Sequence, residues 1–136
     1  MQELTLDARL ESIPAAVDFV DRALEAVGCP MKVQFQFNVA IDELLSNISR
    51  YAYAPDTGKA TVRFEFDAAQ NMAHITFIDR GIPYDPLQKG DPDISLTADK
   101  REVGGLGIFM VKKMMDDMCY RREDGCNILR ISKKLG

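Results

Sequence analysis

Hydrophobic and polar side chains alternate in three short segments of the chain, and alternation of this kind is typical of strands that bury one face. These segments are residues 2–7, 59–67 and 72–79. Residues 68–71 join the last two and predict a hairpin. Residues 118–123 and 127–133 flank Asp124-Gly125 and predict a second hairpin at the end of the chain.

Apolar side chains recur three and four residues apart in longer segments, which predicts helices. These segments are residues 12–27, 42–53 and 107–118. Gly28 closes the first, and Pro30 can open the next element. Residues 54–58 contain Pro, Asp and Gly and end the second helix.

Residues 32–41 fit two structures. One set of apolar side chains alternates as in a strand: Val33, Phe35, Phe37, Val39 and Ile41. Another set forms a helical stripe: Val33, Phe37, Ala40, Ile41, Leu44 and Ile48. Taken alone, the alternation favours a strand up to about Ile41.

The order of elements predicts one domain over residues 1–136. A strand, helices, two strands, a helix and two strands follow one another, with no repeat and no linker. This order is typical of an α/β (α+β) two-layer sandwich, with helices on one face of a mainly antiparallel, mixed sheet.

Composition and charge exclude several classes of function. The chain has 136 residues, of which 46% are hydrophobic and 28% are charged, as in a globular domain. Its net charge of -4 argues against nucleic acid as a direct partner. No apolar run approaches the roughly 20 residues that span a bilayer, and the first residues lack a secretory signal pattern, so we expect a cytoplasmic protein and no membrane partner. The three cysteines form no CxxC pair and predict reduced thiols.

Two short motifs bring together polar groups that a nucleotide site requires. Glu43 and Asn47 are four residues apart and so share one face of a predicted helix, where they could hold a hard cation or orient a hydroxyl. Asp79 ends a predicted strand, where it could accept from an amine, and Gly81 would let a flat ring approach. Each motif alone also fits a plain alternative, namely the solvated edge of a helix or an ordinary turn.

A glycine-rich loop precedes the last predicted helix. Gly104, Gly105 and Gly107 surround Leu106, and free backbone amides at such a helix start favour phosphate. The loop is neither a Walker loop nor the glycine motif of a dinucleotide-binding domain, so on its own it is a weak signal.

Taken together, the motifs resemble those of the anti-sigma-factor serine/threonine kinases of bacterial partner-switching systems, a branch of the Bergerat-fold ATPases with a histidine-kinase-like ATP-binding domain. The resemblance covers nearly the whole chain. It rests on residues 43–47 (ELLSN), 79–86 (DRGIPYDP), 104–111 (GGLGIFMV) and 120–127 (YRREDGCN).

The resemblance implies roles for these residues. Asn47 would ligate magnesium, Glu43 would be the general base, and Asp79 would bind the adenine amine of ATP. Gly81 would make room for the ring. The phosphate-binding residues would be Gly104, Gly105, Leu106 and Gly107. The resemblance also implies one continuous helix from about residue 31 to residue 53, against the strand that alternation favours.

A nucleotide lid over about residues 87–103 is also implied by the resemblance. Lys89, Lys100 and Arg101 could add positive charge near the γ-phosphate, although ordinary solvated side chains on a loop fit them equally well. His74 lies in a predicted strand, which favours a structural role over that of a phosphoacceptor.

The resemblance further implies a kinase that uses ATP and Mg to phosphorylate an anti-anti-sigma (STAS-type) partner, and that also binds a sigma factor. A homodimer is common in the family. A second hypothesis is a non-catalytic, ATP-gated module that binds proteins, because the presence of Glu43 does not by itself establish an activity.

Overall fold

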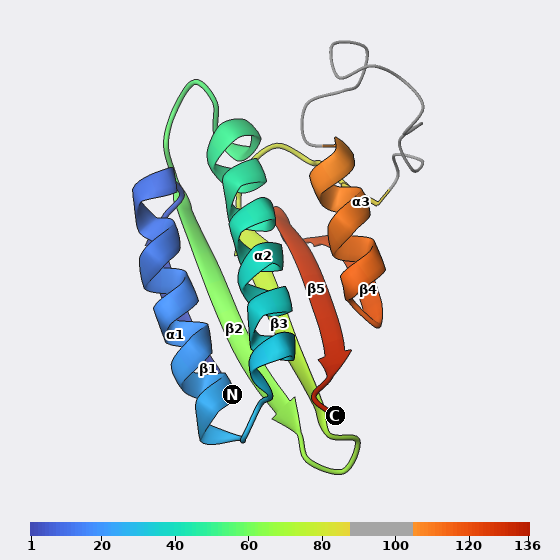
Figure 1. Ribbon diagram of the computed structural model, residues 1–136. Coiled ribbons are helices and arrows are strands. Elements are labelled where there is room, and N and C mark those ends of the chain that lie inside the picture. Colours follow the sequence, from blue (N-terminus) through green and yellow to red (C-terminus); the bar gives the residue numbers. More distant parts are fainter. Residues whose placement is uncertain (88–104) are drawn as a thin grey trace.

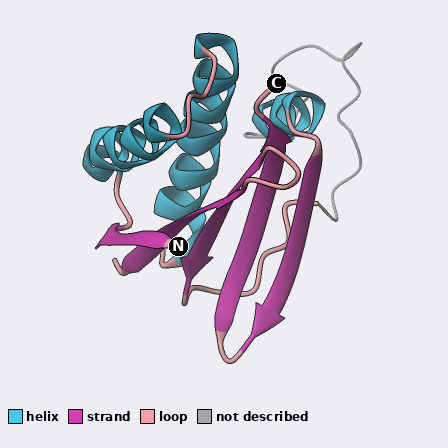
Figure 2. Ribbon diagram, turned by 90° about the horizontal axis from the view of Figure 1, so that it is seen from below, coloured by secondary structure: helices cyan, strands magenta, loops and turns pink. Residues whose placement is uncertain are grey.

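The computed structural model describes residues 1–87 and 105–136, which form a sheet covered on one face by helices (Figure 1). The strands are β1 (Gln2–Asp7), β2 (Lys59–Asp67), β3 (Met72–Asp79), β4 (Asp117–Glu123) and β5 (Cys126–Lys134). The helices are α1 (Ile13–Ala26), α2 (Met31–Asn47) and α3 (Gly105–Met114), with short turns η1 (Leu10–Ser12) and η2 (Ile48–Ala52). The predicted two-layer fold is confirmed (Figure 2). None of the described helices is long and apolar enough to cross a membrane.

The sheet has the strand order β1-β2-β3-β5-β4, and each pairing between its described strands is antiparallel. Because β5 pairs with β3 in the antiparallel direction, the end of β3 is next to the start of β5. The two views agree that all three helices lie on the same side of this sheet (Figures 1 and 2). The opposite face is polar, with pairs such as Arg63 and Glu3 at 2.7 Å.

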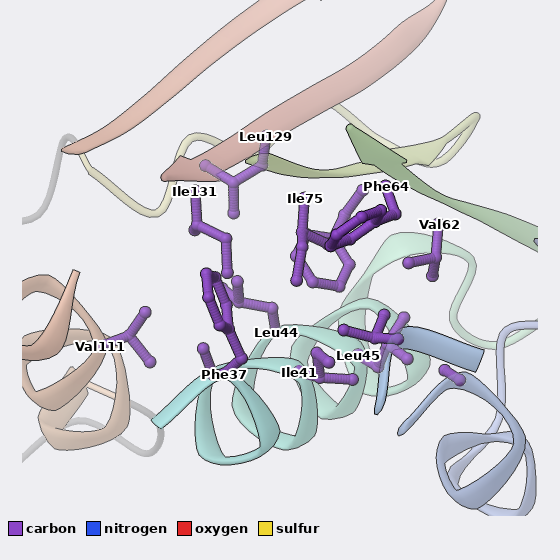
Figure 3. Close-up of a cluster of buried hydrophobic side chains, with 14 of the residues drawn as sticks. Phe37, Ile41, Leu44, Leu45, Val62, Phe64, Ile75, Val111, Leu129 and Ile131 are labelled. Atoms are coloured by element: carbon purple, nitrogen blue, oxygen red, sulfur yellow. The ribbon is translucent and has the colours of Figure 1, made fainter. Parts of the chain in front are cut away.

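The core lies between the helices and the inner face of the sheet (Figure 3). Every second side chain of the strands points into the core from the sheet, and the apolar side chains of α2 provide much of the helical side. Its members include Phe37, Ile41, Leu44, Val62, Phe64, Ile75, Phe77, Val111 and Ile131. Complete burial of a side chain of this size contributes about 1.5–3 kcal/mol to the free energy of folding, so this cluster is the main source of stability.

The strand predicted from the alternation of residues 32–41 is wrong. These residues lie within α2, which continues into η2, as the resemblance implied. The helical stripe decides the outcome, because Phe37 and Ile41 are completely buried while Phe35 is 67% exposed. In a strand, Phe35 and Phe37 would point to the same face and would be buried together. The core buries Phe37 alone.

The last helix also ends earlier than the predicted residue 118. Helix α3 ends at Met114, and Met118 lies in β4. Asp116 explains the early end, because its backbone N–H donates to the Ser132 carbonyl at 2.9 Å, and its carboxylate accepts from the Lys134 N–H at 2.7 Å. These two hydrogen bonds hold Asp116 against β5, so the helix cannot continue past this residue.

His74 lies on the polar face of the sheet, opposite Ser132 of β5. Its Nδ1 is 2.6 Å from the Ser132 hydroxyl oxygen and 3.1 Å from Arg130 Nη2. An arginine can only donate, so Nδ1 is an acceptor and the ring is neutral. Burial, helped by the Arg130 charge, lowers the pKa of His74 below its usual 6.5. His74 therefore has a structural environment, as predicted.

Acid is expected to destabilise the protein through His74. Because the folded protein has the lower pKa, the unfolded state binds the proton first as the pH falls through 6.5, and the free energy of unfolding decreases. Urea unfolding above and below that pH measures the effect, with His74→Gln as the comparison. We expect a smaller loss of stability in the variant; an equal loss would contradict the role of His74.

Candidate functional site

A pocket opens between the end of α2, the turn that follows β3, and strands β4 and β5. The space between its walls, including its open mouth, is about 460 Å³. Its walls are mostly apolar, with Leu44, Phe77 and Leu129 among them. Buried polar groups line the same walls, namely Asn47, Asp79 and Asn127.

Asp79 lines the pocket and has one carboxylate oxygen without a hydrogen bond to the described residues. It ends β3, and its side chain is buried. Oδ1 accepts from the Gly81 N–H at 2.9 Å and from the Asn127 side-chain amide at 2.9 Å. Oδ2 has no hydrogen-bond partner among the described residues. Buried polar atoms in folded proteins are almost always satisfied, so this oxygen is a candidate acceptor for a ligand donor.

Gly81 is required by a close approach of the backbone. A Cβ at this position would lie 2.2 Å from the carbonyl oxygen of Ala52 in η2, and a larger residue would therefore force the turn away from the helix. The adjacent Ile82 N–H donates to the same carbonyl at 2.9 Å. Gly81 is therefore needed for packing against η2. That it also makes room for a flat ring stays a prediction.

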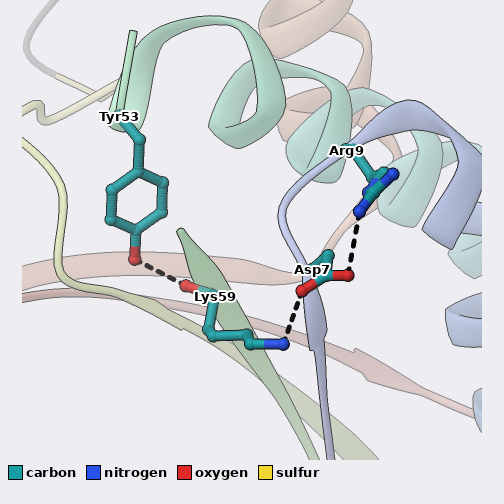
Figure 4. Close-up of polar contacts among 4 residues, drawn as sticks. All are labelled: Asp7, Arg9, Tyr53 and Lys59. Carbon is teal, nitrogen blue, oxygen red and sulfur yellow. Dashed lines mark hydrogen bonds and ion pairs between the residues drawn. The ribbon is translucent and has the colours of Figure 1, made fainter. Parts of the chain in front are cut away.

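Tyr53 connects the start of β2 to the residue that follows β3, and Figure 4 shows its contact with Lys59. Its hydroxyl donates to the Lys59 carbonyl at 2.5 Å and accepts from the Arg80 N–H at 2.7 Å. Lys59 in turn pairs with Asp7 of β1, which also pairs with Arg9 at 3.2 Å. The residue that follows Asp79 is therefore anchored to the neighbouring strands.

Asn47 ends α2, and only 8% of its surface is exposed. Its side-chain amide has no partner within the described parts of the chain, although it lines the pocket. A side-chain carbonyl is a ligand that Mg²⁺ accepts, and magnesium in nucleotide sites is held by few protein groups plus phosphates and water. Residues 1–87 and 105–136 contain no cluster of three His, Cys, Asp or Glu that could hold a metal by itself. Asn47 thus fits a cation that arrives with a phosphate ligand.

Glu43 lies one helical turn before Asn47 and is half-buried. A Cβ added to Gly107 would lie 2.0 Å from Glu43 Oε2, so the carboxylate is packed against the first turn of α3. The N–H groups of that turn have no partner within the helix, and they favour anions. Helix packing therefore brings together the predicted base and one of the predicted phosphate-binding glycines, Gly107.

A family model described as a histidine kinase-like ATPase domain matches residues 6–133. The chain belongs to the histidine kinase-like ATPase domain family. Two curated relatives have the same level of identity. The serine/threonine-protein kinase BtrW of Bordetella bronchiseptica is 27% identical over 101 residues, which is 74% of this chain and 70% of the relative. The serine-protein kinase RsbW of Bacillus thuringiensis is 27% identical over 128 residues, which is 86% of this chain and 79% of the relative. The resemblance drawn from the motifs is confirmed.

Solved structures confirm the histidine kinase-like ATPase fold. The RsbU and RsbW domains of Rv1364c from Mycobacterium tuberculosis superpose with a TM-score of 0.64 at 15% identity, over 99% of this chain and 33% of that chain. The histidine kinase domain of a blue-light activated kinase from Erythrobacter litoralis gives a TM-score of 0.58 at 16% identity, over 90% of this chain and 61% of that chain.

Several predicted residues of this histidine kinase-like ATPase domain lie outside the described residues. These are Gly104 and Arg101, together with Lys89 and Lys100 and all of the lid predicted at about residues 87–103 except Leu87. Gly105 and Leu106 begin α3, two residues before the predicted start of that helix at Gly107.

Asn127 is a buried polar residue of the pocket to which the sequence motifs gave no role of its own. It lies opposite Asp79 in the pairing of β3 with β5. These two strands are separated in sequence by α3 and β4, so local periodicity carries no signal of their pairing. The pairing can be seen only once the order of strands in the sheet is known.

The Gly107→Ala variant tests the contact between α2 and α3. The new methyl group would push the flexible Glu43 carboxylate aside, while alanine suits a helix better than glycine. If Glu43 acts in catalysis, we expect a loss of phosphoryl transfer of about tenfold, because misplaced catalytic groups lose rate. The thermal unfolding midpoint should stay the same or rise. Unchanged transfer with a displaced Glu43 would contradict a catalytic role for this side chain.

Proposed function

We propose that this domain is a protein serine/threonine kinase, which transfers the γ-phosphate of magnesium-bound ATP to a small anti-anti-sigma (STAS-type) protein and also binds a sigma factor. The observation that carries the proposal is the pair of unsatisfied buried groups, Asp79 Oδ2 and the Asn47 amide, in one pocket, with Glu43 one helical turn before Asn47 on α2. The kinase names of BtrW and RsbW support the same class of reaction.

The nucleotide would lie with its base in the apolar pocket and its phosphates at the start of α3. Asp79 would accept from the adenine amine, which is a donor. Backbone amides of Gly104, Gly105, Leu106 and Gly107 would bind the phosphates, and Arg101 would add positive charge. Asn47 would ligate the magnesium, whose charge would offset that of the phosphates.

Glu43 is proposed as the general base for transfer. As the hydroxyl oxygen of a serine or threonine bonds to the γ-phosphorus, the bond from that phosphorus to the bridging oxygen of ADP breaks. The hydroxyl proton moves to a Glu43 carboxylate oxygen. This reaction depends mainly on positioning and on charge neutralisation, and the packing of Glu43 against α3 would supply the position.

Phosphorylation would add negative charge to the partner and release it from the kinase, whose surface would then be free for the sigma factor. We extend the proposal to a homodimer with no direct contact to nucleic acid. These features rest on the resemblance and on the net charge of -4.

The proposal is tested with the protein as bait in host lysate, with and without ATP and Mg²⁺. Captured proteins and new phosphosites are identified by mass spectrometry. We expect capture of a small partner that gains a phosphate on Ser or Thr and then dissociates. ATP-dependent capture without new phosphate would contradict the kinase and would favour the ATP-gated binding module.

A further inference from the structure

Strand β4 ends the sheet, and no described strand pairs with the edge that faces away from β5. Asp124 and Gly125, both with positive φ, form the two-residue turn between these strands, and Glu123 pairs with Cys126 across it. Residues that close such a turn exchange hydrogen bonds, and hydrogen-bonded pairs then alternate along the strands. Backbone groups that point away from β5, and that can pair with another strand, therefore belong to Met118, Tyr120 and Arg122.

The face of β4 opposite the helices carries charges of both signs. Its side chains are exposed and alternate along the strand: Asp117, Cys119, Arg121 and Glu123. Arg121 Nε lies 3.0 Å from Glu123 Oε2, whereas Asp117 has no ion pair within residues 1–87 and 105–136. An exposed ion pair contributes little to stability, and a guanidinium has enough donors for two carboxylates. Arg121 can therefore contact a second acid while it keeps Glu123.

These charges select one register for pairing with a second copy of β4. In a symmetric antiparallel pair about Cys119, each Asp117 lies opposite an Arg121, and such opposite charges attract. A shift to a pair about Tyr120 would place Asp117 opposite Glu123, which repels. A shift to a pair about Arg121 would place this arginine opposite its own copy. Charges at a sheet edge normally prevent pairing, and here they favour only the register about Cys119.

We propose that two copies of this chain associate through β4, in an antiparallel pair centred on Cys119 that joins their sheets into one. This inference rests on the homodimer of the proposed function and names the surface that forms it. Met118 and Tyr120 are half-buried on the face covered by helices, and each would lie opposite the other across the interface. Tyr120 also lines the pocket, so the second copy would lie next to the proposed nucleotide site.

The first test uses the position of Cys119 at the centre of the pair. Its backbone groups point toward β5, so the two copies of Cys119 would form a non-hydrogen-bonded pair. The Cα atoms of such a pair lie about 4.5 Å apart, within the range that a disulfide bridges. With the thiol oxidant diamide, we expect a covalent dimer on non-reducing electrophoresis, and we expect none with Cys119→Ser, which keeps the half-buried Cys29 and Cys126.

Glu123→Cys in the Cys119→Ser background is the matched control for this cross-link. It places a thiol at an exposed position on the same face of the same strand, away from the centre of the pair. We expect about tenfold less covalent dimer than with Cys119, because the two thiols would lie too far apart to bridge. Equal cross-linking at both positions would show random collision and would overturn the inference.

The second test exchanges the charges. Asp117→Arg and Arg121→Asp each replace the two attractive pairs of the symmetric dimer by two repulsive pairs. We expect each to raise the Kd of the dimer, measured by sedimentation velocity, by about tenfold. The double variant Asp117→Arg/Arg121→Asp restores opposite charges, and its Kd should return to within about threefold of the wild-type value. A purely structural effect of the single changes would not be reversed in the double variant.

The outcomes separate this inference from the proposed function. If the wild-type protein is a dimer, and the single variants keep its Kd or the double variant does not restore it, the inference is overturned and the homodimer stands on another surface. If the wild-type protein is a monomer, the homodimer and the inference fail together. Phosphoryl transfer is measured separately and decides the kinase assignment in each case. Loss and restoration of the dimer, with a selective cross-link at Cys119, support the inference.

Discussion

Glu43→Ala is expected to lower phosphoryl transfer by about 10²–10⁴-fold and to leave ATP binding nearly unchanged, because a general base acts on the acceptor hydroxyl and not on the nucleotide. Glu43 is separate from the residues that line the apolar pocket, and its carboxylate is packed against Gly107 at the start of α3. Single-turnover transfer and equilibrium titration with ATP measure the two effects separately.

Asp42→Ala is the control for Glu43→Ala, since it removes the same charge from the neighbouring, exposed position on α2. We expect wild-type transfer for this control. An equal loss of binding and transfer in Glu43→Ala would assign Glu43 to nucleotide binding and would rule it out as the base. Glu43→Gln should behave like Glu43→Ala, because the amide keeps the shape and cannot take the proton.

Asp79→Asn is expected to raise the Kd of ATP by about 10²-fold and to reverse the preference between ATP and inosine triphosphate. The Gly81 N–H and the Asn127 amide both donate to the Oδ1 position, so the oxygen of the new amide would stay there. Its NH₂ group would then take the place of Oδ2 and present a donor to the pocket, which repels the adenine amine and suits an oxygen at C6.

Asp117→Asn serves as the control for Asp79→Asn, because Asp117 is exposed at the start of β4. Its titration should match that of the wild-type protein. A wild-type Kd for ATP in Asp79→Asn would remove Asp79 from the base-binding site. Weaker ATP binding without reversal of the preference would show that the orientation of the new amide is not controlled by Gly81 and Asn127.

The sheet was largely predictable from the sequence, because strands with one buried face alternate. The bounds of β2 and β3 match the predicted residues 59–67 and 72–79. Alternation misled at residues 32–41, where Phe35 completes a strand pattern yet lies exposed on α2. The apolar side chains at helical spacing, including Phe37 and Ile41, are buried against the sheet, and this burial outweighs the preference for a strand that the alternation indicates.

The site was predictable only in part, because its residues come from elements far apart in sequence. Spacing alone indicated that Glu43 and Asn47 share a helix face, and the motifs suggested Asp79 and the glycines. The structure shows that Asn47 and Asp79 line one pocket and that Glu43 lies against Gly107. Long-range strand pairing, which no local pattern encodes, placed Asn127 opposite Asp79.

A crystal structure of the protein with Mg²⁺ and a non-hydrolysable ATP analogue tests the central claim most directly. We predict that the adenine amine lies within hydrogen-bond distance of Asp79 Oδ2, that the metal is bound by Asn47, and that the phosphates contact the first turn of α3 beside Glu43. An analogue bound with its base outside the pocket, or with its phosphates away from α3 and Asn47, would contradict the account.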